Sequence, residues 1–287
     1  MTIDRRALIA ATPALLLPAS AWAQSAPPAI AAYEKTSKGR VGPYAKNLDN
    51  GREIAWRADE RFVMCSTFKM SLAACVLSRV DKGHEKLDRV IAYSEKDLEP
   101  YAPVAKENLA HGGMTVQAMC KAAVELSDNT CANKLLEAIG GPSALTAFWR
   151  ETGDQTSRLD HNEPLLNRSK PGDPHDTTTP RARSENLRRF VLGKVLKDGS
   201  RERLTTWMLN CQTGANRLRA GLPKGWMVGD KTGNNGADAC GDLAVAWIEP
   251  GKPVLIVCYV QGGKPKPADQ DALFAAVGRM VGERLKS

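Results

Sequence analysis

The sequence predicts an α+β fold, in which one antiparallel sheet is built from both ends of the chain and flanked by terminal helices, with an all-helical region inserted between them. Three observations support this. Near the N-terminus, the strand-like segments 41–48 and 53–57 are joined by the tight-turn signal Asp49-Asn50-Gly51. Near the C-terminus, three further strand-like segments occur at 226–232, 242–249 and 253–260. The residues between these two groups follow helical patterns.

The helices frame and interrupt this sheet. A first helix is expected over residues 25–40, with Pro27-Pro28 at its start. The central helix, from Ser66 to about Lys82, is apolar nearly all round, as expected of a buried helix. Further helices are predicted at 115–126, 130–139, 142–153, 181–197, 200–212 and 269–286. The loop at 155–180 is long enough to suggest a function of its own.

Length and composition are those of an ordinary globular protein. The 287 residues are 43% hydrophobic and 25% charged, which excludes a disordered or fibrous chain. No internal repeat or low-complexity linker is visible. We expect residues 24–287 to form one domain, with a sheet part of about 24–60 and 212–287 and a helical part of about 66–211.

The first 23 residues have the features of a signal peptide. Arg5-Arg6 precede a moderately apolar stretch, which proline interrupts and which is too short to span a membrane. Ala21-Trp22-Ala23 then has the small-x-small form that signal peptidase cleaves. The paired arginines leave both the twin-arginine and the Sec route open. We therefore expect a periplasmic or secreted protein without stable membrane insertion.

The charge is basic, with 40 Lys and Arg against 32 Asp and Glu and a formal net charge of +8. Basic residues nowhere alternate with aromatic ones in a block, and no zinc-finger spacing occurs, so a nucleic-acid partner is not expected. A solvated basic surface suits anionic substrates or an anionic cell envelope.

Cysteine and histidine do not predict a metal site. The seven cysteines form no C-x-x-C motif, and the four histidines show no metal-ligand spacing. An odd number of cysteines leaves at least one thiol unpaired within the chain. We expect several buried free thiols, and neither a metal nor an organic cofactor.

The start of the central helix carries a candidate nucleophile. Ser66 and Lys69 are three residues apart and therefore share one helical face. A serine hydroxyl attacks only when a base takes its proton, and a lysine desolvated by burial has a lowered pKa and can act as that base. Read alone, S-x-x-K is a weak signal, and an N-cap serine followed by an ordinary lysine is the alternative.

Two downstream motifs strengthen this interpretation. Ser127-Asp128-Asn129 lies in a predicted turn between helices, and Lys231-Thr232-Gly233 lies at the end of a predicted strand. S-x-x-K, S-D-N and K-T-G in this order are typical of class A β-lactamases and penicillin-binding proteins. Over essentially the whole mature sequence, the chain resembles a class A serine β-lactamase. The resemblance implies the β-lactamase/transpeptidase-like fold, with residues 24–287 as the catalytic domain.

The resemblance also implies catalytic roles. Ser66 would be the acylated nucleophile, and Lys69 and Glu163 would share the base role in acylation, with the dominant base left open. Ser127 would relay a proton to the β-lactam nitrogen. Glu163 belongs to an E-P-x-L-N segment, and with help from Asn167 it would activate the water that releases the acyl group. A solvent-facing loop glutamate is the alternative.

Further residues would hold the substrate. Asn129 would hydrogen-bond the acylamino side chain, and Lys231 and Thr232 would bind the substrate carboxylate, next to Gly233 of the same motif. The backbone N–H groups of Ser66 and Asn234 would form the oxyanion hole.

Two more residues fit the family less specifically. Tyr101 matches the aromatic residue at the mouth of the site, although a packed loop tyrosine is nearly as good an interpretation. Arg217 matches an arginine that some members bring to the substrate carboxylate, with a surface arginine at a helix end as its alternative.

The chain departs from the family at three places. His161 stands where an arginine usually pairs with the aspartate of D-T-T, here Asp176, so the catalytic loop is expected to respond to pH. Cys65 precedes the nucleophile, as in carbapenem-hydrolysing members of the family. The resemblance makes a disulfide between Cys65 and Cys240 possible, and it extends the expected substrates to carbapenems. Cys75 and Cys120 do not match the helix-bridging pair of another subgroup.

The leading interpretation is hydrolysis of the β-lactam amide of penicillins and cephalosporins, which confers antibiotic resistance, by a monomer. A D-alanyl-D-alanine peptidase shares the three motifs but lacks the arrangement of Glu163 and Asn167. A penicillin-binding sensor domain is acylated and remains so. Glu163 argues against both.

Overall fold

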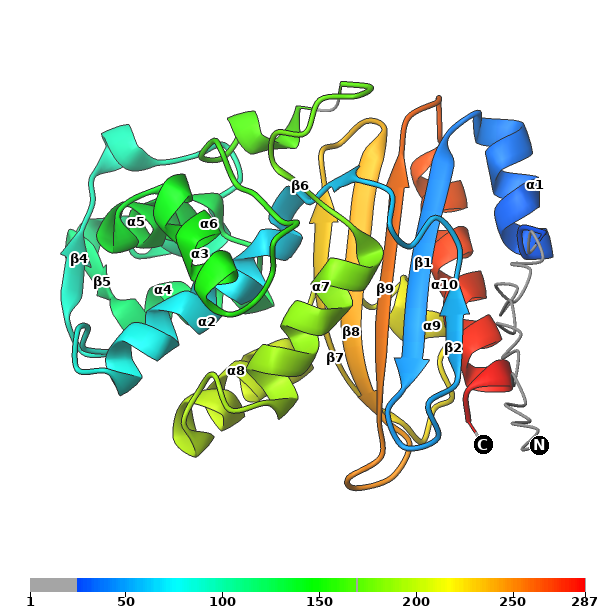
Figure 1. Cartoon of the computed structure of the whole chain (residues 1–287). Helices are drawn as coiled ribbons and strands as arrows, with labels where there is room; N and C mark the ends of the chain where they lie inside the picture. The colour runs from blue at the N-terminus through cyan, green and yellow to red at the C-terminus, as the bar shows by residue number, and fades with distance from the viewer. Residues whose placement is uncertain (1–24, 169, 287) are drawn as a thin grey trace, which may run out of the picture.

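A five-stranded antiparallel sheet joins the two ends of the chain, as predicted (Figure 1). The computed structural model describes residues 25–168 and 170–286, so the predicted signal peptide at 1–23 lies outside the described residues. The strand order is β2-β1-β9-β8-β7. The strands are β1 (Arg40–Asn47), β2 (Glu53–Ala55), β7 (Met227–Asn234), β8 (Ala239–Trp247) and β9 (Pro253–Gln261).

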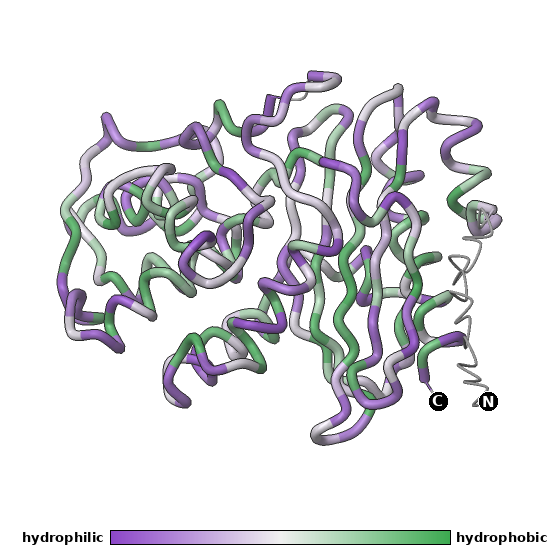
Figure 2. The backbone as a smooth tube through the Cα atoms, in the orientation of Figure 1, coloured by the Kyte–Doolittle hydropathy of each residue, from purple (hydrophilic) through white to green (hydrophobic). Residues whose placement is uncertain are grey.

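The register of β1 on β9 fixes the N-terminal segment into the sheet. Arg40 pairs with Gln261 and Asn47 with Val254, so the whole of β1 lies along β9. Alternate residues of β9 face opposite sides. Ile256 packs in the core cluster with Phe274, and its neighbour Val257 packs in the other cluster. In Figure 2 the strands in the middle of the sheet are mostly hydrophobic. The sheet is therefore covered on both faces.

Helices α1 (Pro28–Ser37) and α10 (Pro267–Arg284) cover one face of the sheet, with the short α9 (Leu218–Gly221) packed against α10. The other face meets α7 (Pro180–Leu187) and the helical region (Figure 1). The remaining helices are α2 (Phe68–Asp81), α3 (Pro103–Glu107), α4 (Val116–Glu125), α5 (Asn129–Ile139), α6 (Pro142–Glu151) and α8 (Asp198–Leu209). Two small sheets pair β3 (Phe62–Val63) with β6 (Thr177–Thr178) and β4 (Val90–Ala92) with β5 (Gly113–Thr115). The α+β prediction is confirmed.

Helix α2 is the centre of the helical region. Every residue from Phe68 to Ser78 is buried, which explains its apolar character all round. Two of its neighbours begin at side-chain caps, because Thr115 accepts a hydrogen bond from the Ala118 N–H and Asp128 accepts one from the Cys131 N–H. Among the described residues, no helix is both long and apolar enough to cross a bilayer.

Three predicted elements were wrong in detail. Helix 181–197 ends at Leu187 and continues as a π-helical turn, Arg188–Leu192. Residues 193–197 then form a loop whose carbonyl groups at Gly193 and Leu196 accept hydrogen bonds from Arg201. The central helix starts with a 3₁₀ turn, Cys65–Thr67, before α2. Between the central helix and the helix at 115–126, where no element was predicted, the chain forms β4, α3 and β5.

Candidate active site

The turn that carries Ser66 is held in an unusual conformation. Cys65 has φ +45°, a left-handed value that is rare for a residue other than glycine. The Thr67 hydroxyl closes the turn through a 2.7 Å hydrogen bond to the carbonyl oxygen of Met64. Strand β7 passes very close, because a Cβ on Gly233 would lie 2.9 Å from that same oxygen and 3.0 Å from the Ser66 nitrogen. This contact explains why the K-T-G motif ends in glycine.

Lys69 is completely buried beside the nucleophile. Its Nζ donates to the Ser127 carbonyl oxygen at 2.8 Å and to Asn129 Oδ1 at 2.5 Å, and it lies 3.0 Å from Glu163 Oε1. Burial lowers the pKa of Lys69, and the Glu163 carboxylate opposes this effect. The site therefore holds an ammonium group that gives up its proton more easily than a solvated lysine does.

Glu163 contacts both of these residues. Its Oε1 accepts a 3.0 Å hydrogen bond from Ser66 Oγ, and its Oε2 accepts one of 2.5 Å from Asn167 Nδ2. Asn133 fixes its backbone, with Oδ1 accepting from the Glu163 N–H and Nδ2 donating to the Glu163 carbonyl, both at 2.9 Å. Asn133 was not predicted from the sequence. Its place one helical turn after Asn129 on α5 was the available signal.

Each of the three residues of the S-D-N turn contacts a different part of the site. Ser127, at φ +60°, accepts a 3.1 Å hydrogen bond from Lys231 Nζ on its hydroxyl oxygen. Asp128 caps α5 with one oxygen, and with the other it accepts hydrogen bonds from the N–H groups of Val104 and Ala105 in α3. The Asn129 N–H donates to the Tyr101 carbonyl, which places half-exposed Tyr101 at the rim of the site.

The K-T-G strand supplies a second buried lysine. Burial, with Lys69 nearby, lowers the pKa of Lys231 to about 8. Thr232 shares a 2.5 Å hydrogen bond between hydroxyl groups with Thr213. Thr213 belongs to no motif, and its place in the site was not predicted from the sequence.

Arg217 precedes α9 and is 8% exposed. Its Nη1 donates to the carbonyl oxygens of Gly233 and Gly241 at 2.9 Å each, and its Nε lies 3.4 Å from Asp271. These contacts hold Arg217 against β7 and β8 next to Thr232, rather than on the surface as an unconstrained side chain.

Every predicted site residue except Lys69 and Lys231 lines a cavity of about 360 Å³, together with Thr213. That volume lies within the usual range for pockets that bind small molecules. Lys69 and Lys231 are fully buried behind the residues that line the cavity. Both ammonium groups donate to Ser127 Oγ, and Ser127 lines the cavity. His161 lies in the catalytic loop, where its Nδ1 is 2.7 Å from Asp176 Oδ2.

The Cys65–Cys240 bond that the sequence left possible is not formed, and all seven cysteines are free. The Cys65 thiol donates to the Ala239 carbonyl at 3.7 Å, whereas Cys240 packs in the core between the sheet and α10. The two side chains thus lie in different layers. Cys75 and Cys120 are also unbonded. Among the described residues, no group of three or more histidine, cysteine, aspartate and glutamate side chains has metal-binding geometry.

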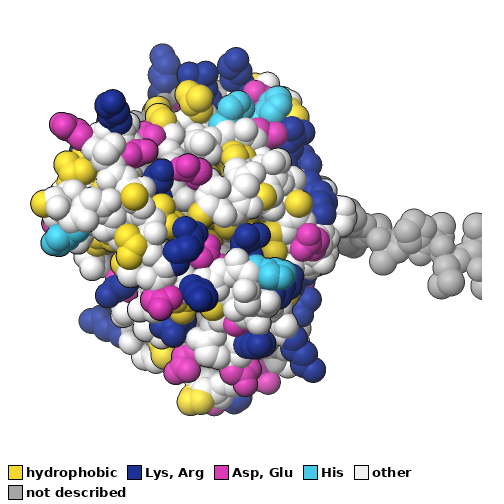
Figure 3. Space-filling model, turned by 90° about the vertical axis from the view of Figure 1, so that its left-hand side faces the viewer, with side chains coloured by type: hydrophobic (Ala, Val, Ile, Leu, Met, Phe, Trp, Pro, Cys, Tyr) yellow, Lys and Arg dark blue, Asp and Glu magenta, His cyan; other side chains and the backbone are white. Residues whose placement is uncertain are grey.

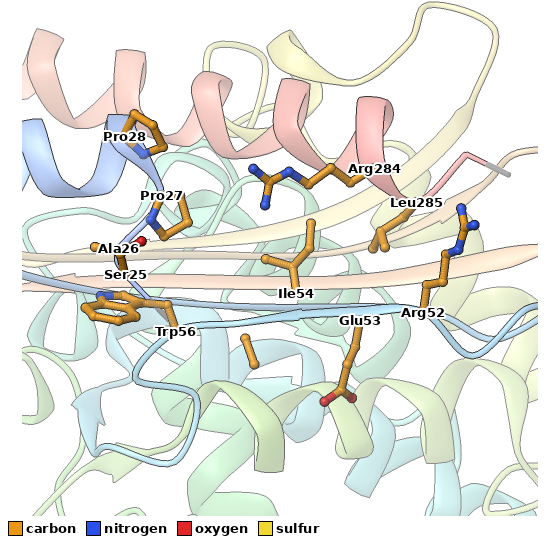
Figure 4. A pocket seen from close by; sticks show the side chains of 11 residues that line it. Ser25, Ala26, Pro27, Pro28, Arg52, Glu53, Ile54, Trp56, Arg284 and Leu285 are labelled. Atoms are coloured by element: carbon orange, nitrogen blue, oxygen red, sulfur yellow. The ribbon is translucent and has the colours of Figure 1, made fainter. Parts of the chain in front are cut away.

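A second cavity, of about 480 Å³, lies at the opposite edge of the sheet between β2, the start of α1 and the end of α10 (Figure 4). Figure 4 shows Ile54 pointing toward Leu285 and Arg284, while Glu53 points to the other side of the strand. Its lining includes Ser25 and Glu53, but Glu53 Oε2 accepts a hydrogen bond from the Tyr44 hydroxyl. Among its described lining residues, this cavity therefore has no carboxylate directed at a serine as Glu163 is directed at Ser66.

Comparisons with known proteins agree with this geometry. The model of the Beta-lactamase enzyme family matches residues 27–285. The chain is 46% identical to Beta-lactamase L2 of Stenotrophomonas maltophilia over 89% of this chain and 84% of the relative, and 41% identical to Beta-lactamase CTX-M-97 of Escherichia coli over 91% and 89%. Among solved structures, an ancestral (GNCA) class A β-lactamase matches with a TM-score of 0.84 and 51% identity over 88% of this chain and 97% of that one. With the motifs, the cavity and these relatives in agreement, the chain belongs to the class A β-lactamase family.

Proposed function

We propose that this enzyme hydrolyses the β-lactam amide of penicillin- and cephalosporin-type antibiotics through an acyl-enzyme on Ser66, and thereby confers resistance. The observation that carries the proposal is the position of Glu163. Its carboxylate contacts both Ser66 and Lys69, and it is held by Asn133 and Asn167. A carboxylate in this place can activate water next to a serine ester.

Acylation begins when Ser66 Oγ attacks the β-lactam carbonyl carbon. Either Lys69 or Glu163 accepts the hydroxyl proton, since burial lowers the pKa of Lys69 and the Glu163 carboxylate already accepts a hydrogen bond from the hydroxyl. The carbon–nitrogen bond then breaks, and the nitrogen takes a proton from Ser127. The Ser127 hydroxyl lies within hydrogen-bonding reach of both Lys69 and Lys231, which can replace the proton it gives.

Charge on the reacting oxygen is stabilised by the backbone N–H groups of Ser66 and Asn234. Loss of such a donor typically costs about 10²- to 10³-fold in rate. The close approach of Gly233 to the Ser66 nitrogen brings β7 to the turn and so supports this pairing of donors.

Substrate orientation comes from groups around the cavity. Lys231 and Thr232 bind the substrate carboxylate, with Arg217 next to them. Asn129 hydrogen-bonds the acylamino group, and Tyr101 packs at the rim. A charge-assisted hydrogen bond to the carboxylate fixes the β-lactam ring above Ser66.

Deacylation uses a water molecule between Glu163 and Asn167. Glu163 takes a proton from the water, which attacks the ester carbon, and Ser66 regains its hydroxyl. General-base help of this kind typically contributes about 10²- to 10⁴-fold.

Intact-protein mass spectrometry during turnover of a chromogenic cephalosporin tests the proposal. We expect the wild type to turn over with little adduct and Glu163→Ala to accumulate an acyl group on Ser66. Ser66→Ala is the matched control and should remain unmodified. A wild type that stays acylated without turnover would instead be a penicillin-binding sensor. Release of D-alanine from a D-alanyl-D-alanine peptide, without β-lactam turnover, would identify a peptidase.

The proposal includes export and a monomeric state. Residues 1–23 direct the chain to the periplasm or the medium, where the antibiotic reaches it, by the Sec or twin-arginine route. Cell fractionation of the wild type and of Arg5→Lys/Arg6→Lys tests the route, and size-exclusion chromatography with light scattering tests the monomer. Carbapenem hydrolysis is a further part of the proposal, which turnover of a carbapenem in the same mass-spectrometry assay tests; the Cys65–Cys240 bond that suggested it is not formed.

A further inference from the structure

Arg183 is among the largest completely buried side chains of the protein, although arginine is almost always solvated or ion-paired. It projects from α7 into the core between the sheet and the helical region. Among the described residues it contacts two hydroxyl groups, a thioether and an aromatic ring rather than a carboxylate. Its Nε is buried without a hydrogen-bond partner among those residues.

The partners of Arg183 surround the turn that carries the nucleophile. Nη1 donates a 2.7 Å hydrogen bond to Ser71 Oγ in α2, and Nη2 lies 2.9 Å from Met64 Sδ. The guanidinium group also lies beside the Tyr259 hydroxyl, which shares a 2.7 Å hydrogen bond with Thr67 Oγ1. Arg183 thus contacts residues before and after Ser66, and reaches Thr67 through Tyr259.

This turn needs support from outside. Cys65 has a left-handed conformation, which is unfavourable for a side chain with a Cβ and persists only where the surroundings hold it. Met64 and Thr67 are the two ends of the turn, and the Met64 carbonyl accepts hydrogen bonds from both the N–H and the hydroxyl of Thr67. One planar guanidinium group bridges both ends and the first turns of α2.

The stability of the fold does not explain this arginine. A buried charge without a carboxylate partner is costly, and replacing buried ionic groups by apolar residues of similar volume often leaves stability unchanged or raises it. The Trp149 ring, with its centroid 5.3 Å from the guanidinium carbon, offsets only part of that cost.

We propose that Arg183 is a positioning residue for acylation, which holds the turn at 64–67 so that Ser66 Oγ faces the substrate carbonyl. The inference rests on the proposed serine acyl-enzyme chemistry, but adds a residue that contacts neither the substrate nor the reacting atoms. Small displacements of a nucleophile cost large factors in rate, so the effect falls on acylation. Lys231, Thr232 and Asn129 are on other elements, so initial binding of the substrate is unaffected.

The test measures acylation alone. In a Glu163→Ala background, where the acyl-enzyme accumulates, time-resolved mass spectrometry with a chromogenic cephalosporin gives the acylation rate and the dissociation constant of the initial complex. We expect Arg183→Met to acylate about 10-fold more slowly with an unchanged dissociation constant. Its melting temperature should be equal to or above that of the parent, since methionine fills the same space without a charge.

The control is Arg181→Met, two residues before Arg183 in α7, where Arg181 pairs with Asp59 on the surface. It should acylate at the parent rate. Arg183→Lys keeps the charge but has one nitrogen in place of the two that contact Ser71 and Met64. Its acylation rate should lie between those of the parent and Arg183→Met. If Arg183→Met does not fold, the rate of Arg183→Lys decides.

Unchanged acylation in Arg183→Met, or in Arg183→Lys when that variant decides, would overturn the inference. The inference would also be overturned if the acylation rate fell only in variants whose melting temperature fell too, because that pattern indicates a merely structural role. Either result leaves the proposed function intact as long as the wild type turns over. A parent that is never acylated refutes the proposed function instead.

Discussion

At the residue scale, the main feature is that two lysines, Lys69 and Lys231, are buried on either side of one hydroxyl, that of Ser127. Burial lowers the pKa of both ammonium groups. Each is therefore ready to exchange a proton, but each also loses its charge at a lower pH than a solvated lysine does.

The first prediction concerns pH and Lys231. Its pKa of about 8 is below the ordinary lysine value, so the ammonium group that attracts the substrate carboxylate is lost as the pH rises through 8. We expect kcat/KM to fall between pH 8 and 9.5. Lys231→Arg keeps its charge in this range, so its profile should be flat there, although its activity is lower. An alkaline fall that is identical in both enzymes would contradict this assignment.

The second prediction concerns Asn133. Asn133→Ala leaves the buried N–H and carbonyl of Glu163 without partners, and we expect unfolding free energy to fall by about 1–3 kcal/mol. Displacement of the carboxylate should slow deacylation, by up to about 10²-fold, more than acylation. Burst kinetics with a slow substrate measure both steps. Asn133→Asp keeps the acceptor for the Glu163 N–H but places a carboxylate against Glu99 Oε1 and the Glu163 carbonyl, to which the amide now donates, so it should not be milder than Asn133→Ala. Equal slowing of both steps would argue against a role specific to Glu163.

At the scale of elements, the loop at 155–180 links the base to the rest of the fold. Asp176 Oδ1 accepts hydrogen bonds from the N–H groups of Asp160 and His161, and Oδ2 contacts the His161 ring. The His175 ring lies 5.9 Å from that of His161, and its Nδ1 is 2.5 Å from Asp173. The two ends of the loop, which we call its neck, thus bring two imidazoles close to carboxylates, and Arg158 forms an ion pair with Asp160.

The third prediction follows from this neck. The His161 imidazole offers Asp176 Oδ2 one hydrogen-bonding nitrogen, whereas an arginine would offer two parallel donors and a permanent charge. We therefore expect His161→Arg to hold the loop more firmly. The ratio of the turnover rates of wild type and variant should differ between pH 5.5 and 8 by about threefold. Superimposable profiles of the two enzymes between pH 5.5 and 8 would rule the effect out.

What the sequence predicted of these elements followed local chemistry. The tight turn at Asp49-Asn50-Gly51 and the helix start at Thr115 were predicted correctly because neighbouring residues determine them. The end of α7 was not predicted, because its loop is held by Arg201 and by Asp81, which accepts hydrogen bonds from Lys197 and Ser200. Those contacts are tertiary.

The same distinction applies to the site. The family motifs pointed to Ser66, Lys69 and Glu163, because each motif is contiguous in the sequence. Asn133 and Arg183 belong to no motif, and their roles depend on what the fold brings next to them. No local pattern reveals that an arginine on a surface-like helix is completely buried.

At the scale of the whole molecule, charged side chains of both signs cover the surface, and the thiols lie in the interior. Figure 3 shows lysine and arginine side chains spread among acidic ones over the helical side, without a continuous basic face. All seven thiols are inside, and burial raises the pKa of each one of them. Protonated thiols are poor nucleophiles, so the cysteines of the folded protein are expected to be unreactive.

The fourth prediction counts these thiols. With a chromogenic disulfide reagent, the native protein should react slowly, and the protein unfolded without reductant should release seven equivalents. The melting temperature should not change with reductant. A release of five equivalents from the unfolded protein would show that one disulfide, such as Cys65–Cys240, does form. Cys240→Ser, which cannot form this bond, is the control and should release six.

The pairing of β1 with β9 has a consequence for how the protein is made. Arg40 and Gln261 are sheet neighbours but lie almost at opposite ends of the polypeptide. The N-terminal strand therefore has no partner on one side until nearly all of the chain has emerged from the ribosome. Such distant pairings make folding slow. Synthesis thus ends before the sheet can close, and cellular factors that recognise the nascent N-terminus have that entire interval in which to act.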